Sequence, residues 1–246
     1  MRDVGAELLF RAGLTRPARA ARGQLSVLAL HRVLPEAELR EYPLGEIAMS
    51  VEEFGWLASF LAEHFTCATL GEAHRRWLAG ESPGRPFLAM TFDDGQRDNF
   101  EHARPILERE GLRASFFVPV DAIEGDEPLW HDRLGYALQR LLRSGRARAL
   151  EVVAPLVPVD ADDDHALVLE ALERAKRLPP EARMALVGRA EAALGAPARP
   201  AWDGAMRWDE LRALVRGGHE VGAHSQSHPI LTLVDGAQLE QEVAGS

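Results

Sequence analysis

The sequence predicts an α/β fold with a mainly parallel sheet or barrel, and three observations support this class. Short apolar runs alternate along the chain with segments whose apolar residues recur at helical spacing. The apolar runs have the length of buried strands, and glycine or proline bounds the clearest of them. A chain of 246 residues with 46% hydrophobic residues can bury a substantial core without disulfide bonds.

The composition argues against several classes of protein. A formal net charge of −10 disfavours nucleic-acid binding, because phosphate groups attract the opposite sign. The single cysteine, Cys67, can form neither an intramolecular disulfide nor a zinc-thiolate cluster. No stretch reaches the roughly 18 apolar residues of a membrane span, and no secretory signal is evident. We therefore expect a cytoplasmic protein; its oligomeric state does not follow from the sequence.

Residues 1–23 are predicted to be a separate N-terminal segment. The segment contains several arginines but only a short apolar run at residues 8–10. A helix packed on the following domain is the favoured interpretation. The alternative is an amphipathic segment on a membrane surface, which would make the association with the membrane peripheral.

Residues 24–246 are predicted to form one domain, which begins with a strand, a helix and a second strand. Residues 24–31 form a short apolar run and predict a buried strand. Ser50 and Glu53 match a helix capping box, and apolar residues at helical spacing follow them. Residues 87–92 predict the second buried strand.

The later part of the domain continues the alternation. Residues 98–110 predict a helix that Pro105 kinks, and residues 114–118 predict a third strand. Residues 208–216 predict a helix with Trp208, Leu211, Leu214 and Val215 on one face, and residues 219–223 predict another strand. Active sites of such folds lie at the carboxyl ends of the strands.

A helical insertion is predicted at about residues 131–205, between core strands. This segment is rich in alanine, arginine, leucine and glutamate, and prolines interrupt it. The acidic run at residues 160–164 predicts a solvated turn that caps the next helix, since the ligand spacing of a calcium loop is missing. An amphipathic segment at residues 238–243 follows the last strand.

Two adjacent carboxylates follow the strand at residues 87–92. Asp93 and Asp94 would repel each other and lose hydration unless a cation lies nearby. Neighbouring residues of a strand point to opposite faces, so both side chains can converge only where the strand ends, and Gly95 permits such a turn. The alternative is an acidic turn without a function.

Two histidines four residues apart follow the strand at residues 219–223. In a helical turn His224 and His228 would lie on one face, roughly 5–6 Å apart at Cβ, which suits two ligands of one zinc ion. Pro229 limits the element to a single turn. One carboxylate and two imidazoles at neighbouring strand ends predict a catalytic metal site with open positions.

The two motifs, TFDDG and HSQSHP, resemble the first two motifs of the polysaccharide deacetylases, the NodB-homology domain of carbohydrate esterase family 4. The flanking segments LALHRV, HARPILEREGLRASFFV, LWHDRL and MRWDELRALVRGGHEVGAHSQSHPILT are similar as well. The resemblance extends from residue 25 to the end, and residues 140–200 are its least specific part.

The resemblance implies a distorted (β/α) barrel and a metal-dependent hydrolase that removes N-acetyl groups from the amino sugars of a polysaccharide, a reaction on linear amides. It implies that Asp94, His224 and His228 bind the metal and that Asp93 is the general base. We expect zinc to polarise the acetamide carbonyl and Asp93 to accept the proton of the attacking water.

Other polar residues near these motifs have structural interpretations. Ser225 and Ser227 are expected to orient the turn and the imidazoles, because no G-x-S-x-G signature supports a serine nucleophile. His31, at the end of the first strand, is expected to be structural, with a place at the site as the alternative. The same interpretation holds for residues 130–132.

The later motifs of the family, which supply a backbone oxyanion donor and a general acid, are not found in the chain. The resemblance therefore predicts a barrel without its last strands, belonging either to a fragment or to a truncated homologue. His31 or His131 could replace the acid, but no spacing argument selects either. The alternative functions are a non-catalytic homologue that binds sugar or a partner, and a hydrolase of small cyclic amides with the same fold.

Overall fold

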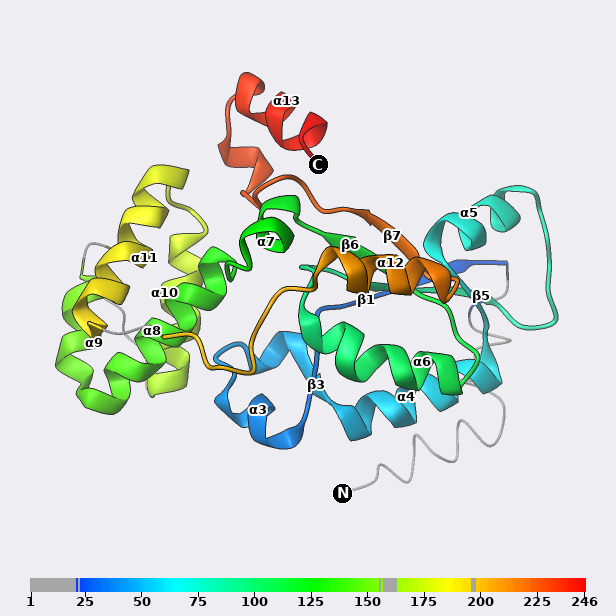
Figure 1. Ribbon diagram of the computed structural model, residues 1–246, viewed down its shortest axis with the longest axis horizontal. Coiled ribbons are helices and arrows are strands. Elements are labelled where there is room, and N and C mark those ends of the chain that lie inside the picture. Colours follow the sequence, from blue (N-terminus) through cyan, green and yellow to red (C-terminus); the bar gives the residue numbers. More distant parts are fainter. Residues whose placement is uncertain (1–20, 22, 155, 157–162, 196–197) are drawn as a thin grey trace.

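The structure is a computed structural model that describes residues 21, 23–154, 156, 163–195 and 198–246. Most of the predicted N-terminal segment, residues 1–23, therefore lies outside the described residues. The described residues form a parallel sheet covered by helices, with a lobe of helices beside it (Figure 1). This arrangement confirms the predicted α/β class and the parallel sheet.

The central sheet has five strands, and every pairing in it is parallel. Its main path runs through β1 (Leu25–Leu30), β5 (Phe87–Phe92), β6 (Ser115–Val118) and β7 (Glu220–Ala223), and β4 (Thr66–Ala68) also pairs with β5. β5 is buried along its whole length, as expected for the middle strand of a parallel sheet. The sheet is open, and the described residues do not form a closed barrel.

The register of the strands aligns their carboxyl ends. Leu30 of β1 lies opposite Phe92 of β5, and Val118 of β6 lies opposite Ala223 of β7. The residues that follow these strands therefore emerge at one edge of the sheet. The polar residues of both motifs, which follow the strands from Asp93 and from His224, lie at this edge.

A small second sheet leads from β1 into the helices. β2 (Arg32–Leu34) pairs in parallel with β3 (Ala48–Ser50). The connection contains α3 (Glu36–Glu41) and a single 3-10 turn, η1 (Gly45–Ile47). Side chains of β2 alternate between two hydrophobic cores, with Val33 in one and Leu34 in the other.

The predicted capping box begins α4 (Val51–His64). The Ser50 hydroxyl accepts a hydrogen bond from the Glu53 N–H, and the Glu53 carboxylate accepts one from the Ser50 N–H. These bonds satisfy two backbone donors that the first turn of a helix leaves unpaired. α5 (Leu70–Leu78) begins in a related way at Thr69, whose hydroxyl accepts from the Glu72 N–H.

One face of the sheet is covered by α4, α6 (Arg104–Arg109) and α12 (Trp208–Arg216). The buried residues of this core include Phe54, Ala58, Leu61, Leu88, Met90, Phe92, Ile106, Leu107, Phe116, Leu211 and Leu214. The predicted helix is confirmed as α12, but of the four apolar residues on its predicted face only Leu211 and Leu214 are buried, whereas Trp208 and Val215 are 44% and 56% exposed. The buried stripe is centred between Leu211 and Leu214 and includes Glu210, so those two residues lie on its flank.

The predicted kinked helix at residues 98–110 is two elements. A π-helical turn, η2 (Asn99–Ala103), precedes α6, and Pro105 lies in the first turn of α6. Proline has no N–H to donate to the preceding turn. The missing hydrogen bond allows the wider π geometry of that turn.

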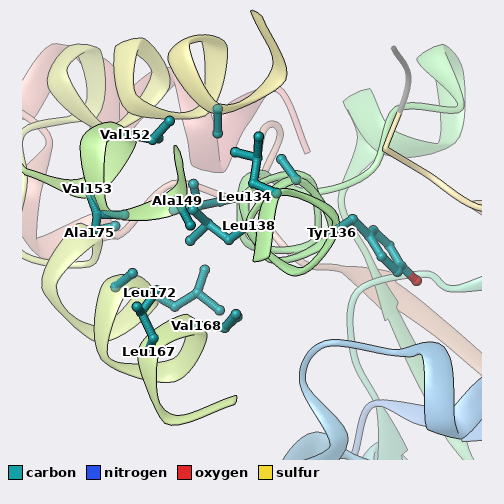
Figure 2. Close-up of a cluster of buried hydrophobic side chains, with 14 of the residues drawn as sticks. Leu134, Tyr136, Leu138, Ala149, Val152, Val153, Leu167, Val168, Leu172 and Ala175 are labelled. Atoms are coloured by element: carbon teal, nitrogen blue, oxygen red, sulfur yellow. The ribbon is translucent and has the colours of Figure 1, made fainter. Parts of the chain in front are cut away.

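The lobe beside the sheet is formed by α8 (Trp130–Ser144), α9 (Arg146–Val153), α10 (Asp164–Ala175) and α11 (Pro180–Leu194), and α7 (Val120–Gly125), whose Ile123 packs in the sheet core, connects β6 to it. α8 to α11 enclose a hydrophobic core of their own, from which Tyr136 points away toward the rest of the molecule (Figure 2). Residues 160–162 of the acidic run lie outside the described residues. Asp163 caps α10 as expected, because its carboxylate accepts from the Ala166 N–H.

A short turn, η3 (Leu231–Leu233), and α13 (Gly236–Ala244) follow the last strand (Figure 1). The Asp235 side chain caps α13 by accepting from the Gln238 N–H. None of the helices in the described part of the chain has the length and apolar character needed to cross a membrane.

Candidate metal centre

A sharp turn at the end of β5 separates the two carboxylates. The Asp93 N–H donates to the Leu30 carbonyl at 3.0 Å and so extends the pairing of β5 with β1. Asp94 and Gly95 then adopt φ values of 74° and 67°, in the left-handed region. A Cβ atom on Gly95 would lie 3.0 Å from the Ile123 side chain and 3.2 Å from that of Val118, so both the backbone angle and the close approach favour glycine. Asp94 is consequently turned inward and is 5% exposed.

The histidine motif is an irregular loop, and the predicted helical turn is wrong. The His224 N–H donates to the Val118 carbonyl at 2.9 Å, and the chain then leaves the sheet. Ser225 and His228 have φ values of 63° and 59°, which a right-handed turn excludes. The Ser225 hydroxyl accepts from the His228 N–H at 3.1 Å, so this serine shapes the loop as expected.

The loop nevertheless brings both imidazoles to Asp94. Oδ1 of Asp94 lies 3.2 Å from Nε2 of His228 and 3.6 Å from Nε2 of His224. One ligand atom from each of the three residues lies within 4.8 Å of the others. Zinc bonds of about 2.0–2.1 Å in a tetrahedron place ligand atoms roughly 3.4 Å apart, so the donor set and its spacing fit a metal ion.

The pKa shifts of Asp94 and His224 also suit metal binding. Burial would raise the pKa of Asp94, but the hydrogen bond with His228 and the charge of His131 outweigh burial and hold it well below its usual value. Burial and the neighbouring His228 lower the pKa of His224. An ionised carboxylate and neutral imidazoles are the forms that bind metals.

Asp93 lies beside the triad in a different environment. Its side chain is half-buried, and burial raises the pKa of its carboxyl group. The charge of Asp94 raises this pKa further, while His224 and His31 oppose the shift. The structure thus places Asp93 next to the predicted ligands, at the same edge of the sheet.

His31 and His131 also lie at the site, although structural roles were the favoured interpretation of both. They line a cavity of about 470 Å³ together with Asp94, His224 and His228. His31 could be recognised by its place at the carboxyl end of a core strand, the criterion that selected the two motifs. Asp132 is fully buried and accepts hydrogen bonds from other side chains, which agrees with its structural interpretation.

A second cavity, of about 480 Å³, adjoins the first. Both cavities are lined by Trp130, His228 and Pro229. α10 contributes to the wall of the first cavity and α11 to the wall of the second. The Arg183 guanidinium lies 4.9 Å from the centre of the Trp130 ring and donates to backbone carbonyls, including those of Ala175 and Leu178. These contacts fix Trp130 between the two cavities.

α13 holds the histidine loop from the other side. The buried carboxylate of Glu242 accepts from the Ser227 N–H at 2.8 Å and from the Ser227 hydroxyl at 2.5 Å. The Glu242 carbonyl accepts from the Gln226 N–H at 3.0 Å. The sequence indicated an amphipathic segment here, but no local signal assigns Glu242 to the loop.

A buried ionic cluster lies behind the site. Arg32 is 2% exposed and donates to Asp98 at 2.8 Å and to Asp203 at 2.7 Å. Burial would lower the pKa of Arg32, but the two carboxylates hold it well above its usual value. The Asn99 side chain donates to the His31 carbonyl at 2.9 Å, which fixes the backbone of that histidine.

Comparisons with known proteins show which fold the chain shares. No protein-family model and no curated protein matches the chain. Among solved structures, a Streptococcus pyogenes deacetylase, PplD, in complex with acetate is similar over 90% of this chain and 65% of its own, with 13% identity and a TM-score of 0.52. IcaB from Ammonifex degensii gives 17% identity and a TM-score of 0.47 over 90% of this chain and 65% of its own.

A de-N-acetylase from Aggregatibacter actinomycetemcomitans gives 15% identity and a TM-score of 0.38 over 82% of this chain and 54% of its own. The likeness to PplD shows that this chain has the fold of a deacetylase structure, which confirms the resemblance at the level of the fold. The chain spans about 65% of the length of that protein.

Proposed function

We propose that the protein is a metal-dependent hydrolase that removes N-acetyl groups from the amino sugars of a polysaccharide. The observation that carries this proposal is the convergence of Asp94, His224 and His228 beside Asp93 at the carboxyl edge of the sheet. The shared fold supports it, because PplD is described as a deacetylase and its structure holds acetate, the product that such a reaction releases.

The site residues have two roles, metal binding and proton transfer. Asp94, His224 and His228 hold a divalent metal, for which zinc suits one oxygen and two nitrogen ligands. A metal bound there would act as a Lewis acid toward the acetamide carbonyl. Asp93 accepts the proton of the attacking water, since it is the carboxylate next to Asp94 that is not one of the three converging residues.

Departure of the amine requires a proton donor, and we assign this role to His31. Its side chain is half-buried and lines the cavity that Asp94 also lines. His131 lines the same cavity, but its Nε2 is buried and faces Asp94. A positioned general acid contributes about 10²–10⁴ in rate. The sequence assigned no residue to this role, and His31 would fill it.

The paired cavities favour a polymeric substrate over a small cyclic amide. Cavities of about 470 and 480 Å³ meet at Trp130, His228 and Pro229. A sugar unit at the metal centre then has room for a neighbouring unit on the far side of Trp130. A small cyclic amide would leave the second cavity without a role.

Acetate release tests this function. Wild-type protein loaded with Zn²⁺ should release acetate from N-acetylglucosamine oligomers, and Asp94→Asn should abolish both metal binding and release. Asp209→Asn, at an exposed position on α12, is the matched control and should behave as wild type. Binding of metal and oligomer without acetate release would identify a non-catalytic homologue. Hydrolysis of a small cyclic amide, with no acetate release from the oligomers, would show that the proposed substrate class is wrong.

A further inference from the structure

His131 is a histidine of the helical lobe that faces the predicted metal ligands. It lies in the first turn of α8, and its side chain is 13% exposed. Its Nε2 lies 3.8 Å from Oδ2 of Asp94, the oxygen opposite the one that faces His224 and His228. This nitrogen is buried and has no hydrogen-bond partner among the described residues.

Asp132 is the competing acceptor, and both of its oxygens already accept hydrogen bonds. Its Oδ1 lies 3.8 Å from the same nitrogen of His131 but accepts from the Tyr42 hydroxyl at 2.8 Å. Its Oδ2 accepts from Nε2 of Gln96 at 3.1 Å. Because both oxygens of Asp132 are already engaged, Oδ2 of Asp94 is the favoured acceptor for His131.

The surroundings of His131 fix the direction of its ring. Asp132, the next residue, bonds the first turn of α8 to Tyr42 and to Gln96, which follows the Asp94 turn by two residues. The Trp130 ring packs edge-on against the His131 ring, with centroids 5.6 Å apart and an interplanar angle of 88°. A movement of about 1 Å brings Nε2 and Oδ2 to hydrogen-bond distance.

We propose that His131 is a positioning residue of the metal centre. It donates from Nε2 to Oδ2 of Asp94 and so keeps Oδ1 turned toward His224 and His228. The inference rests on the metal site of the proposed function. Through His131, the helical lobe would contribute to metal binding as well as to the walls of the cavities. Groups that orient a metal ligand in this way typically contribute 10–100-fold to metal affinity.

Metal binding without substrate tests this role. Co²⁺ affinity would be measured by competition with a chelator, with its visible absorption band recorded, for wild type, His131→Leu and His131→Gln. Glutamine retains a donor close to the position of Nε2, whereas leucine retains only the volume. His165→Gln, at an exposed position on α10, is the control. The melting temperature of each metal-free protein reports folding.

We expect His131→Leu to bind Co²⁺ about 10–100-fold more weakly with an altered band, and His131→Gln to stay within about threefold of wild type. Unchanged affinity in His131→Leu overturns the proposal, as does an equal loss in both variants. If His131→Leu fails to fold, His131→Ala, which also removes the donor, replaces it in the same comparison with His131→Gln. Absence of acetate release, with these affinity differences intact, would overturn the deacetylase function and leave the role of His131 standing.

Discussion

At the scale of single residues, Asp93 and Asp94 are neighbours in sequence that have different surroundings. Asp94 is buried and faces two imidazoles, whereas Asp93 is half-buried beside them. The left-handed backbone of Asp94 produces this separation. The pair can therefore divide metal binding and proton transfer between its two members.

Replacing Asp93 by Asn tests that division. The variant should retain nearly all of its bound metal, because Asp93 is not one of the three converging ligands, and lose about 10²–10⁴ in turnover. Metal content by elemental analysis and acetate release per bound metal are the measurements. A variant that loses its metal would show that Asp93 is a ligand and that the assignment of roles is wrong.

At the scale of elements, the conformation of the histidine loop depends on α13. Glu242 accepts two hydrogen bonds from Ser227, and these hold the loop while Ser225 and His228 have left-handed backbones. Removing the carboxylate leaves the loop free to relax toward more common backbone angles.

Glu242→Ala should therefore weaken metal affinity by about tenfold, as expected when a group that orients ligands is removed. Glu240→Ala, an exposed position on the same helix, is the matched control. Both affinities would be measured by chelator competition. Equal affinities in the two variants would show that the loop keeps its shape without α13.

Local sequence patterns predicted the elements better than the loops between them. The strands β1, β5, β6 and β7 and the capping box of α4 follow from residues adjacent in sequence, such as Ser50 and Glu53, and so could be predicted. The strands β2, β3 and β4 have three residues each, too few to show an apolar pattern, and were not predicted. The spacing of His224 and His228 suggested a helical turn, and this prediction was wrong. The hydrogen bonds from Glu242 that shape the loop come from another part of the sequence, so the local spacing does not reveal them. His131 joins the site through bonds of Asp132 to Tyr42 and Gln96, which no local pattern reveals.

At the scale of the whole molecule, the buried cluster around Arg32 joins the sheet to the lobe. Arg32 pairs with Asp98 and Asp203, and its guanidinium lies 4.6 Å from the centre of the Tyr42 ring. Tyr42 belongs to the core that α8 to α11 enclose, and Val33, next to Arg32, belongs to the core of the sheet.

Asp98→Asn should destabilise the protein by about 3–5 kcal/mol, because it removes a charge from a buried pair and leaves Arg32 undercompensated. Urea unfolding of the variant and of the exposed control Asp209→Asn would measure this loss. A difference below about 1 kcal/mol would show that Asp203 alone compensates Arg32.

The division into two hydrophobic cores has a consequence for how the protein responds to heat. Asp94, His224 and His228 follow strands of the sheet, whereas Trp130 and His131 belong to the lobe. The Arg32 cluster is a polar part of the join between the cores, beside the apolar contacts of Leu34 and Tyr42. Warming that loosens this join would widen the cavities while each core remains folded. Activity would then disappear at a lower temperature than helical structure does, and cooling would restore it.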